Sequence, residues 1–350
     1  MFLSLSGQLF AIFSAILFGV SPALCKLVIG EMSPALLAGL LYLGSGLGLQ
    51  FQLLFQRKNT LAAVWRLSPP HRCKLLGSVI FGGILAPLCF AYGIKFGFAS
   101  ETSLLLNLET VATTVIAWLF FKEHVGLPVW IGKVFILLGA SLIIIKAEHA
   151  IAFSLPGLFV VLACVFWGID NNLTRDIEDL PAGILASIKG LTAGIFNILL
   201  ALAFSTGTTT PFQVGASLLI GAVCYGLSLV LFVEALRKIG AARTSTYFAI
   251  GPFVGAIFSV LFLGERMQAA YWGASLLMLA GLVFLYREIH QHLHAHEQIS
   301  HSHRHIHDEH HQHLHEKAAR KEPHEHSHVH EPITHIHVHW PDIHHRHRHG

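Results

Sequence analysis

Charged residues are scarce in this chain. They make up 12% of its 350 residues, while 53% are hydrophobic and the mean hydropathy is +0.60. A soluble globular domain typically contains about 25% charged residues, so this composition leaves too little polar surface for one. We therefore predict that most of the chain is embedded in a lipid bilayer.

Signatures of catalysis and of structural disulfides are also missing. The sequence has no nucleotide-binding loop, no HExxH motif and no spacing that pairs a nucleophile with a base. Its five cysteines stand singly, without a CxxC pair, and four of them lie in apolar runs. This is typical of small buried side chains rather than of disulfides or a metal cluster. We expect no enzyme, no required cofactor and no nucleic-acid partner.

Long apolar runs, separated by short polar or Pro/Gly breaks, dominate the sequence. Each is close to the roughly 20 residues that a helix needs to cross the hydrocarbon core, and continuous runs of this length predict helices. The first run has no basic segment before it and continues to about Val28, which predicts a spanning helix rather than a cleaved signal peptide. The ten candidate spans are residues 8–28, 34–55, 75–94, 102–121, 129–145, 155–173, 182–204, 214–236, 244–263 and 271–286.

The second half of the apolar region repeats the first. A shift of 142 residues places segment 90–123 on segment 232–265, with identical residues that include Thr102 and Thr244. Such collinear identities predict an internal duplication with five helices in each half. Because five is odd, the halves should enter the membrane from opposite sides. The expected fold class is an all-α membrane protein with ten transmembrane helices in two inverted five-helix repeats.

The domains and their orientation follow from this pattern. With the N-terminus inside, the inner loops hold eleven basic residues, and the outer loops hold only Lys26, Lys95, Lys146 and Arg266. Since Lys and Arg favour the cytoplasmic side, both termini are predicted to be cytoplasmic, in a membrane of the bacterial inner-membrane type. The expected domains are repeat one at 1–148, repeat two at 149–288 and a His-rich tail at 289–350.

Short motifs recur at matching places in the two halves. The halves open with Phe-Gly-Val-Ser-Pro and Phe-Trp-Gly-Ile-Asp, and their fourth helices end in Lys-Glu and Gly-Glu. With the ten-helix duplication, these motifs resemble the EamA-type branch of the drug/metabolite transporter superfamily over residues 8–287. That family usually has Glu-Pro in both fourth helices, whereas here Glu109 precedes Thr110 and Pro252 lacks the Glu. The resemblance implies ten helices around a central cavity and transport, often export, of small organic solutes.

Ionisable side chains inside the apolar runs are candidates for a cargo site, because a charge at membrane depth costs about 3 kcal/mol or more. Lys189 lies eight residues past Pro181 in an otherwise apolar run, and Asp170 lies in the preceding run. The alternative is internal pairing of these charges, which would only hold the bundle together. The predicted cavity residues are Lys189, Asp170, Asn171, Glu109 and Glu234.

Histidine alternates with other residues in the tail. In extended backbone a spacing of two places neighbours on one face, and imidazole suits Zn, Ni and Cu. The alternative is a polar tail that senses pH without metal. We expect a disordered tail that binds Zn or Ni through His290, His292, His294, His296, His301, His303, His305, His307, His324, His326, His328, His330, His335, His337 and His339.

The expected function is a secondary transporter that exports a small organic metabolite and carries a metal-binding cytoplasmic tail. A lysine within a span repels cations and suits a carboxylate or a zwitterion, and no span contains a histidine. One alternative is a transporter of a divalent transition metal (Zn, Ni or Co) that the His-rich tail feeds or regulates, and the four cysteines in the spans favour it. Another is a membrane metal sensor that transports nothing. The expected partners are the lipid bilayer and the small-molecule or metal cargo, while the oligomeric state stays open.

Overall fold

The computed structural model divides the chain into two compact units, Met1–Glu288 and Ile289–Gly350. The structure describes residues 2–56, 60–65, 67–122, 125–146, 152–175, 177, 180–205, 207–286, 290–296, 299–305, 324–330 and 333–339. The predicted boundary between the two repeats, at residue 148, lies outside these described residues.

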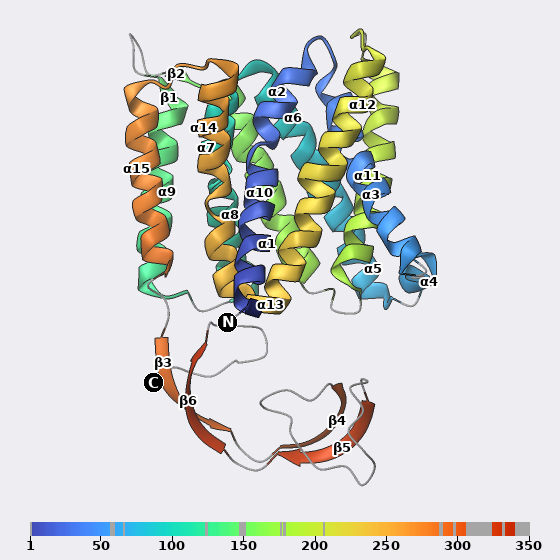
Figure 1. Ribbon diagram of the computed structural model, residues 1–350, viewed down its shortest axis with the longest axis vertical. Coiled ribbons are helices and arrows are strands. Elements are labelled where there is room, and N and C mark those ends of the chain that lie inside the picture. Colours follow the sequence, from blue (N-terminus) through green and yellow to red (C-terminus); the bar gives the residue numbers. More distant parts are fainter. Residues whose placement is uncertain are drawn as a thin grey trace. The chain divides into compact units, whose positions relative to one another are not determined.

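The first unit is a bundle of helices that run up and down beside one another (Figure 1). Its first half contains α1 (Phe2–Gly19), α2 (Ser21–Ile29), α3 (Pro34–Phe55), α4 (Thr60–Trp65), α5 (Pro69–Ser78), η1 (Val79–Leu85), α6 (Ala86–Phe96), α7 (Ala99–Leu105), α8 (Leu108–Phe121) and α9 (Leu127–Ile144). Strands β1 (Ile145–Lys146) and β2 (Ala152–Phe153) pair after α9. The second half contains α10 (Leu155–Arg175), α11 (Ala182–Phe204), α12 (Pro211–Ile220), η2 (Gly221–Leu227), α13 (Ser228–Phe248), α14 (Gly251–Leu263) and α15 (Ala269–Tyr286).

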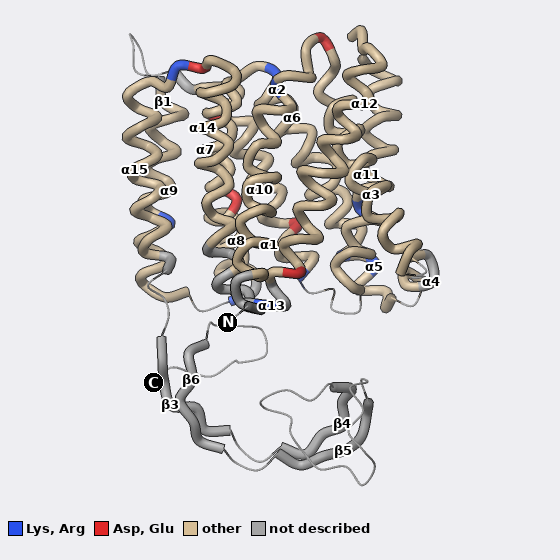
Figure 2. The backbone as a smooth tube through the Cα atoms, viewed as in Figure 1, with Lys and Arg blue, Asp and Glu red and all other residues tan. Residues whose placement is uncertain are grey.

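Eight segments of the described chain are long and apolar enough to cross a membrane, and two shorter apolar helices follow them, Gly251–Leu263 and Ala269–Phe284. Charged residues gather toward the ends of the bundle, with few between (Figure 2). Large apolar side chains such as Phe120 and Phe204 are 76% and 82% exposed, which suits contact with lipid rather than water. The prediction of an integral membrane protein is confirmed, while the count of ten spans and their inverted arrangement stay predictions.

Glycines bring α3 and α11 into close contact. A Cβ built on Gly190 would lie 2.8 Å from the Cα of Gly46, and one on Gly194 would lie 2.5 Å from the backbone nitrogen of Leu43. Neither position can accept a side chain unless the two backbones separate. The small residues at 190 and 194 therefore serve packing within the molecule, as expected for this spacing in a membrane helix.

Two π-helical turns interrupt long helices at matching places. η1 separates α5 from α6, and η2 separates α12 from α13. A π-turn departs from the α-helical pattern, so its backbone groups need other partners inside a membrane. In η1 the carbonyl of Gly82 accepts a hydrogen bond from Tyr42 Oη at 2.6 Å, and the carbonyl of Gly83 accepts one from Asn197 Nδ2 at 3.3 Å. Side chains of α3 and α11 thus stabilise the distortion.

The described residues of the tail unit form four strands in two antiparallel pairs. β3 (His290–His296) pairs with β6 (Ile333–His339), and β4 (Ile299–His305) pairs with β5 (His324–His330). The expectation of a disordered tail is therefore wrong for these four segments. The physical reason lies in the sequence itself, because alternation with a period of two matches the two faces of extended backbone.

Candidate functional site

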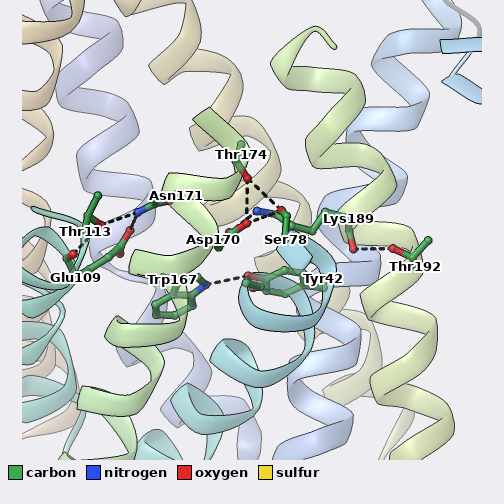
Figure 3. A network of polar contacts seen from close by, with 11 residues as sticks. Tyr42, Ser78, Glu109, Thr113, Trp167, Asp170, Asn171, Thr174, Lys189 and Thr192 are labelled. Atoms are coloured by element: carbon green, nitrogen blue, oxygen red, sulfur yellow. Dashed lines mark hydrogen bonds and ion pairs between the residues drawn. The ribbon is translucent and has the colours of Figure 1, made fainter. Parts of the chain in front are cut away.

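Lys189 and Asp170 form an ion pair inside the bundle. Nζ of Lys189, on α11, lies 2.6 Å from Oδ2 of Asp170, on α10 (Figure 3). The other carboxylate oxygen, Oδ1, accepts hydrogen bonds from Ser78 Oγ at 2.5 Å and from Thr174 Oγ1 at 3.0 Å. The side chain of Asp170 is 3% exposed and that of Lys189 is 17% exposed. Three donors from three parts of the chain therefore compensate one buried carboxylate.

The local sequence explains why the carboxylate fits. Asp170 and Thr174 are four residues apart on α10, so they lie on the same face of that helix. Gly82 of η1 lies against the carboxylate, and a Cβ built there would overlap the Asp170 side chain. The glycine makes room for the ion pair between α10 and η1.

Two aromatic side chains lie beside this ion pair. Trp167 Nε1 donates a hydrogen bond to Tyr42 Oη at 3.1 Å, and Tyr42 Oη donates to the carbonyl of Gly82 at 2.6 Å. Figure 3 shows both rings next to Asp170. They join α3, α10 and η1 around the carboxylate. No sequence pattern distinguishes these two rings from the many other aromatic residues of the chain.

Glu109 and Asn171 form a second polar group on the neighbouring helix pair. Oε1 of Glu109, on α8, accepts a hydrogen bond from Asn171 Nδ2 at 2.9 Å, and the same amide donates to Thr113 Oγ1 at 3.2 Å. Glu109 is half-buried and Asn171 is exposed. Because Asn171 follows Asp170 directly on α10, the two polar groups occupy adjacent positions of one helix (Figure 3).

The predicted cavity residues thus fall into three places. Lys189 contacts Asp170 directly, and Glu109 contacts Asn171. Glu234 is half-buried on α13, and the contacts of the other four residues described above do not include it. Four of the five predicted residues therefore lie on three helices, α8, α10 and α11, and form two contacting pairs.

Among the described residues, two other buried charged side chains were not predicted from the sequence. Glu101 is 2% exposed, and its carboxylate accepts hydrogen bonds from Ser154 Oγ at 2.5 Å and from Tyr271 Oη at 3.3 Å. It was missed because it precedes the predicted span that begins at Thr102. Lys133 is 5% exposed on α9. It lies inside the predicted span 129–145, so a charge within an apolar run was the signal that could have identified it.

Two charged side chains hold the turn between α6 and α7, which we call the α6–α7 clamp. Lys26 donates to backbone carbonyls at the end of α6, and the carboxylate of Glu265 accepts from the start of α7. The acceptors of Lys26 Nζ are the carbonyls of Ile94, Lys95 and Gly97, at 2.8, 3.1 and 2.7 Å. The donors to Glu265 are Ala99 N, Ser100 N and Ser100 Oγ, at 2.8, 2.9 and 2.6 Å. A positive charge is favourable at the C-terminal end of a helix and a negative charge at the N-terminal end. Lys26 therefore stabilises the end of α6, and Glu265 stabilises the start of α7.

A metal site in the bundle would need several ligand side chains close together. Among the described side chains, no group of three or more His, Cys, Asp or Glu residues could hold a metal ion. His307 lies outside the described residues. The other predicted tail ligands, His290 to His305 and His324 to His339, are described only as backbone, so their metal binding stays a prediction.

Long apolar helices with charged and hydrogen-bonded side chains between them define a polytopic membrane protein, and such side chains at membrane depth are candidates for a transport site. The chain belongs to the EamA-like transporter family. The model of that family matches twice, at residues 5–145 and again at residues 155–287. The resemblance noted from the sequence motifs is therefore confirmed in both halves.

The proteins that this chain is similar to include two transporters and one protein of solved structure. An uncharacterized transporter of Methanothermobacter thermautotrophicus (strain Delta H) is 27% identical over 294 residues, which cover 80% of this chain and 86% of that protein. The pseudopaline exporter CntI of Pseudomonas aeruginosa, from strains UCBPP-PA14 and PAO1, is 31% identical over 131 residues, 37% of this chain and 45% of the exporter. A crystal structure of a protein 19% identical in sequence aligns with a TM-score of 0.60, over 80% of this chain and 96% of that one, and supports the fold alone.

Proposed function

We propose that this protein is a secondary transporter that exports a small organic metabolite carrying a carboxylate or both charges. In this proposal ten helices form two inverted repeats in a membrane of the bacterial inner-membrane type, with both termini in the cytoplasm. Two separate family matches, eight long apolar segments and two shorter apolar helices support this arrangement. A relative named as an exporter supports the outward direction.

The observation that carries the proposal is the incomplete coordination of Lys189. An ammonium group has three N–H donors. Asp170 accepts one of them, and among the described residues no other acceptor contacts Lys189 Nζ. The side chain is 17% exposed, so two donors are available to a carboxylate of the cargo. Asp170 stabilises the half-buried ammonium group of Lys189. The two N–H groups of Lys189 that Asp170 does not use give the proposed site its preference for anions.

Glu109 adds a negative charge to the proposed site, opposite in sign to Lys189. Its Oε1 accepts from Asn171, and its Oε2 accepts no hydrogen bond from the described residues. A cargo ammonium could use this oxygen while the cargo carboxylate contacts Lys189. Because the two charges lie on either side of α10 (Figure 3), the arrangement suits a zwitterion with separated charged groups better than a simple anion.

The tail forms the second part of the proposal. Its alternating histidines would bind Zn or Ni on the cytoplasmic side, where the tail senses or buffers metal. Neutral imidazole nitrogen is a common ligand for both ions. Regulation by metal then requires no metal cargo.

Transport of a divalent transition metal is the competing function. It is favoured by Cys25, Cys164 and Cys224, which are buried in the same apolar core. Among the described side chains, however, these thiols do not form a group of three ligands. The lysine in the proposed site also repels cations. A membrane metal sensor that transports nothing remains a third class.

The test is the content of cells with and without the protein. Organic acids, amino acids and transition metals are measured in cells that express the wild type, Lys189→Met or the matched control Lys238→Met, which changes an exposed lysine on α13. We expect the wild type and the control to deplete one organic solute and Lys189→Met to leave it unchanged at equal expression. Depletion of metal alone supports the metal transporter, and unchanged contents with well-expressed wild type support the sensor.

A further inference from the structure

The register of the tail strands places histidine opposite histidine. Where β3 pairs with β6, three histidines of each strand face one another in the ladder, and the same is true where β4 pairs with β5. The opposed pairs in the first ribbon are His290 with His339, His292 with His337, and His294 with His335. In the second ribbon they are His301 with His328, His303 with His326, and His305 with His324.

Each ribbon therefore has one face that carries three consecutive cross-strand histidine pairs, which we call a histidine ladder. Residues two apart in a strand belong to the same face, so the six paired histidines of a ribbon share that face, together with one more histidine, His296 in the first ribbon and His330 in the second. The residue pairs on the opposite face of each ribbon also suit this register. Leu293 lies opposite Ile336 in the first ribbon, and Arg304 lies opposite Glu325 in the second. Apolar pairs and opposite charges are favourable cross-strand neighbours.

The dimensions of a ladder suit a transition metal. Directly opposed residues have Cβ atoms about 5 Å apart, and the next residue on the same face of a strand is about 7 Å along. Zinc is held by four ligands in a tetrahedron, with Zn–N distances of about 2.1 Å. Two consecutive pairs of a ladder place four histidines at these backbone spacings, whereas one strand alone places its histidines in a single row.

A bound metal ion would also stabilise the ribbons. A two-stranded ribbon without a core is at best marginally stable in water. Opposed histidines in their charged form would destabilise it further, because like charges directly opposite repel. A bound metal ion removes both difficulties. Its histidine ligands must be neutral, and the free energy of metal binding adds to the stability of the folded ribbon.

We propose that the metal sites of the tail are built across paired strands, so that each histidine ladder binds Zn²⁺ or Ni²⁺ between its two strands and metal binding forms the ribbon. This inference rests on the metal-binding tail of the proposed function and adds its architecture. The rival arrangement is local chelation, in which each block of alternating histidines binds metal by itself.

Block substitutions in the full-length protein separate the two arrangements. Zn²⁺ bound per chain is measured by equilibrium dialysis and elemental analysis at about pH 7.5, where imidazole is neutral. One variant changes the β3 block, His290, His292 and His294, to Gln. A second changes the β6 block, His335, His337 and His339, and a third carries both changes. The matched control combines the β3 block with the β5 block, His324, His326 and His328.

Cross-strand sites predict that the β3 variant, the β6 variant and their combination lose the same number of zinc ions. The control combination loses the sum of its two single losses, because β3 and β5 belong to different ribbons. If the β3 and β6 losses add, the sites are local and the inference is overturned. A wild-type tail that binds no zinc overturns the metal-binding tail itself, which is a different result.

Hydrogen exchange provides a readout of folding in the same samples. Addition of Zn²⁺ should protect the backbone amides of β3 and β6 together, and the β6 variant should lose this protection in β3 while β4 and β5 keep theirs. Protection of β3 that survives in the β6 variant would contradict ribbon formation by metal.

Discussion

Nζ of Lys189 lies 2.6 Å from Oδ2 of Asp170, and the two residues belong to consecutive helices, α11 and α10. The two residues differ in the number of their other hydrogen-bond partners. Asp170 has two further donors, Ser78 and Thr174, whereas Lys189 has one carboxylate acceptor among the described residues. Neutralising the carboxylate therefore leaves the half-buried ammonium without its countercharge, while removing the lysine leaves a carboxylate that keeps two hydroxyl donors.

This inequality predicts different costs for the two single substitutions. Asp170→Asn should lower the free energy of unfolding by about 3–5 kcal/mol, the range for a buried pair that loses one partner. Lys189→Met should cost less and still abolish transport. The measurement is thermal unfolding in detergent beside transport at equal expression. Transport that persists in well-folded Lys189→Met would remove Lys189 from the cargo site and favour a cationic cargo.

Gly82→Ala tests the space around the carboxylate. The added methyl group would overlap Asp170, so we expect loss of transport and destabilisation of the same order as for Asp170→Asn. The matched control is Gly215→Ala in α12, where no atom lies within 4 Å of the added Cβ. There we expect stabilisation of up to about 1 kcal/mol from helix propensity. Equal behaviour of the two variants would mean that room for Asp170 is not needed.

The α6–α7 clamp predicts that Glu265→Gln lowers stability by roughly 1–2 kcal/mol, because it weakens charge-assisted hydrogen bonds to the start of α7. Lys26→Met should act in the same direction at the end of α6. Arg266→Gln changes the charge of the adjacent, exposed residue and should have little effect. Thermal unfolding of the three variants provides the comparison, and a control as unstable as Glu265→Gln would argue for a general charge effect.

Metal binding by the tail should depend on pH with a definite sign. A protonated imidazole cannot bind metal, so affinity is full above the ordinary histidine pKa of about 6.5 and falls as the pH drops below it. Calorimetric titration of the full-length protein with Zn²⁺ at pH values above and below this midpoint measures the change. A chain that ends at Glu288 provides the blank. Affinity that stays constant across the midpoint would exclude imidazole ligands.

The orientation predicts that reporters fused after Gly350 and within residues 59–67 are both cytoplasmic. The reason is the excess of Lys and Arg in the loops on that side. Activity of paired reporters that work on only one side of the membrane decides the question. An external signal from either fusion would contradict the inverted arrangement of the repeats.

The apolar runs predicted where helices lie, but not how those helices are rotated. Asp170 and Lys189 were expected to be neighbours because their helices are consecutive and joined by a short connection. Ser78 and Tyr42 were not expected beside them, because they come from helices about 90 and 130 residues away and their approach depends on the packing of α3 and η1. A run that is apolar all round carries little information about which face turns inward.

Partners at helix ends were equally hard to predict. A lysine near the end of a membrane helix usually extends to the lipid headgroups, yet Lys26 binds the carbonyls that end α6. Nothing local to Lys26 marks Gly97 as its partner, because the contact requires the fold. In the tail, the alternation of histidines contained the strand signal, but pairing between β3 and β6 joins segments separated by some 40 residues.

The two π-turns also hold information about ancestry. η1 begins at Val79 and η2 at Gly221, which is the same interval of 142 residues that aligns the two halves of the sequence. If the predicted duplication holds, a distortion that occupies the same position in both halves was already present in their common precursor. The halves have since diverged around it, so that Gly82 now faces Asp170 in one copy while Cys224 and Tyr225 occupy the turn in the other.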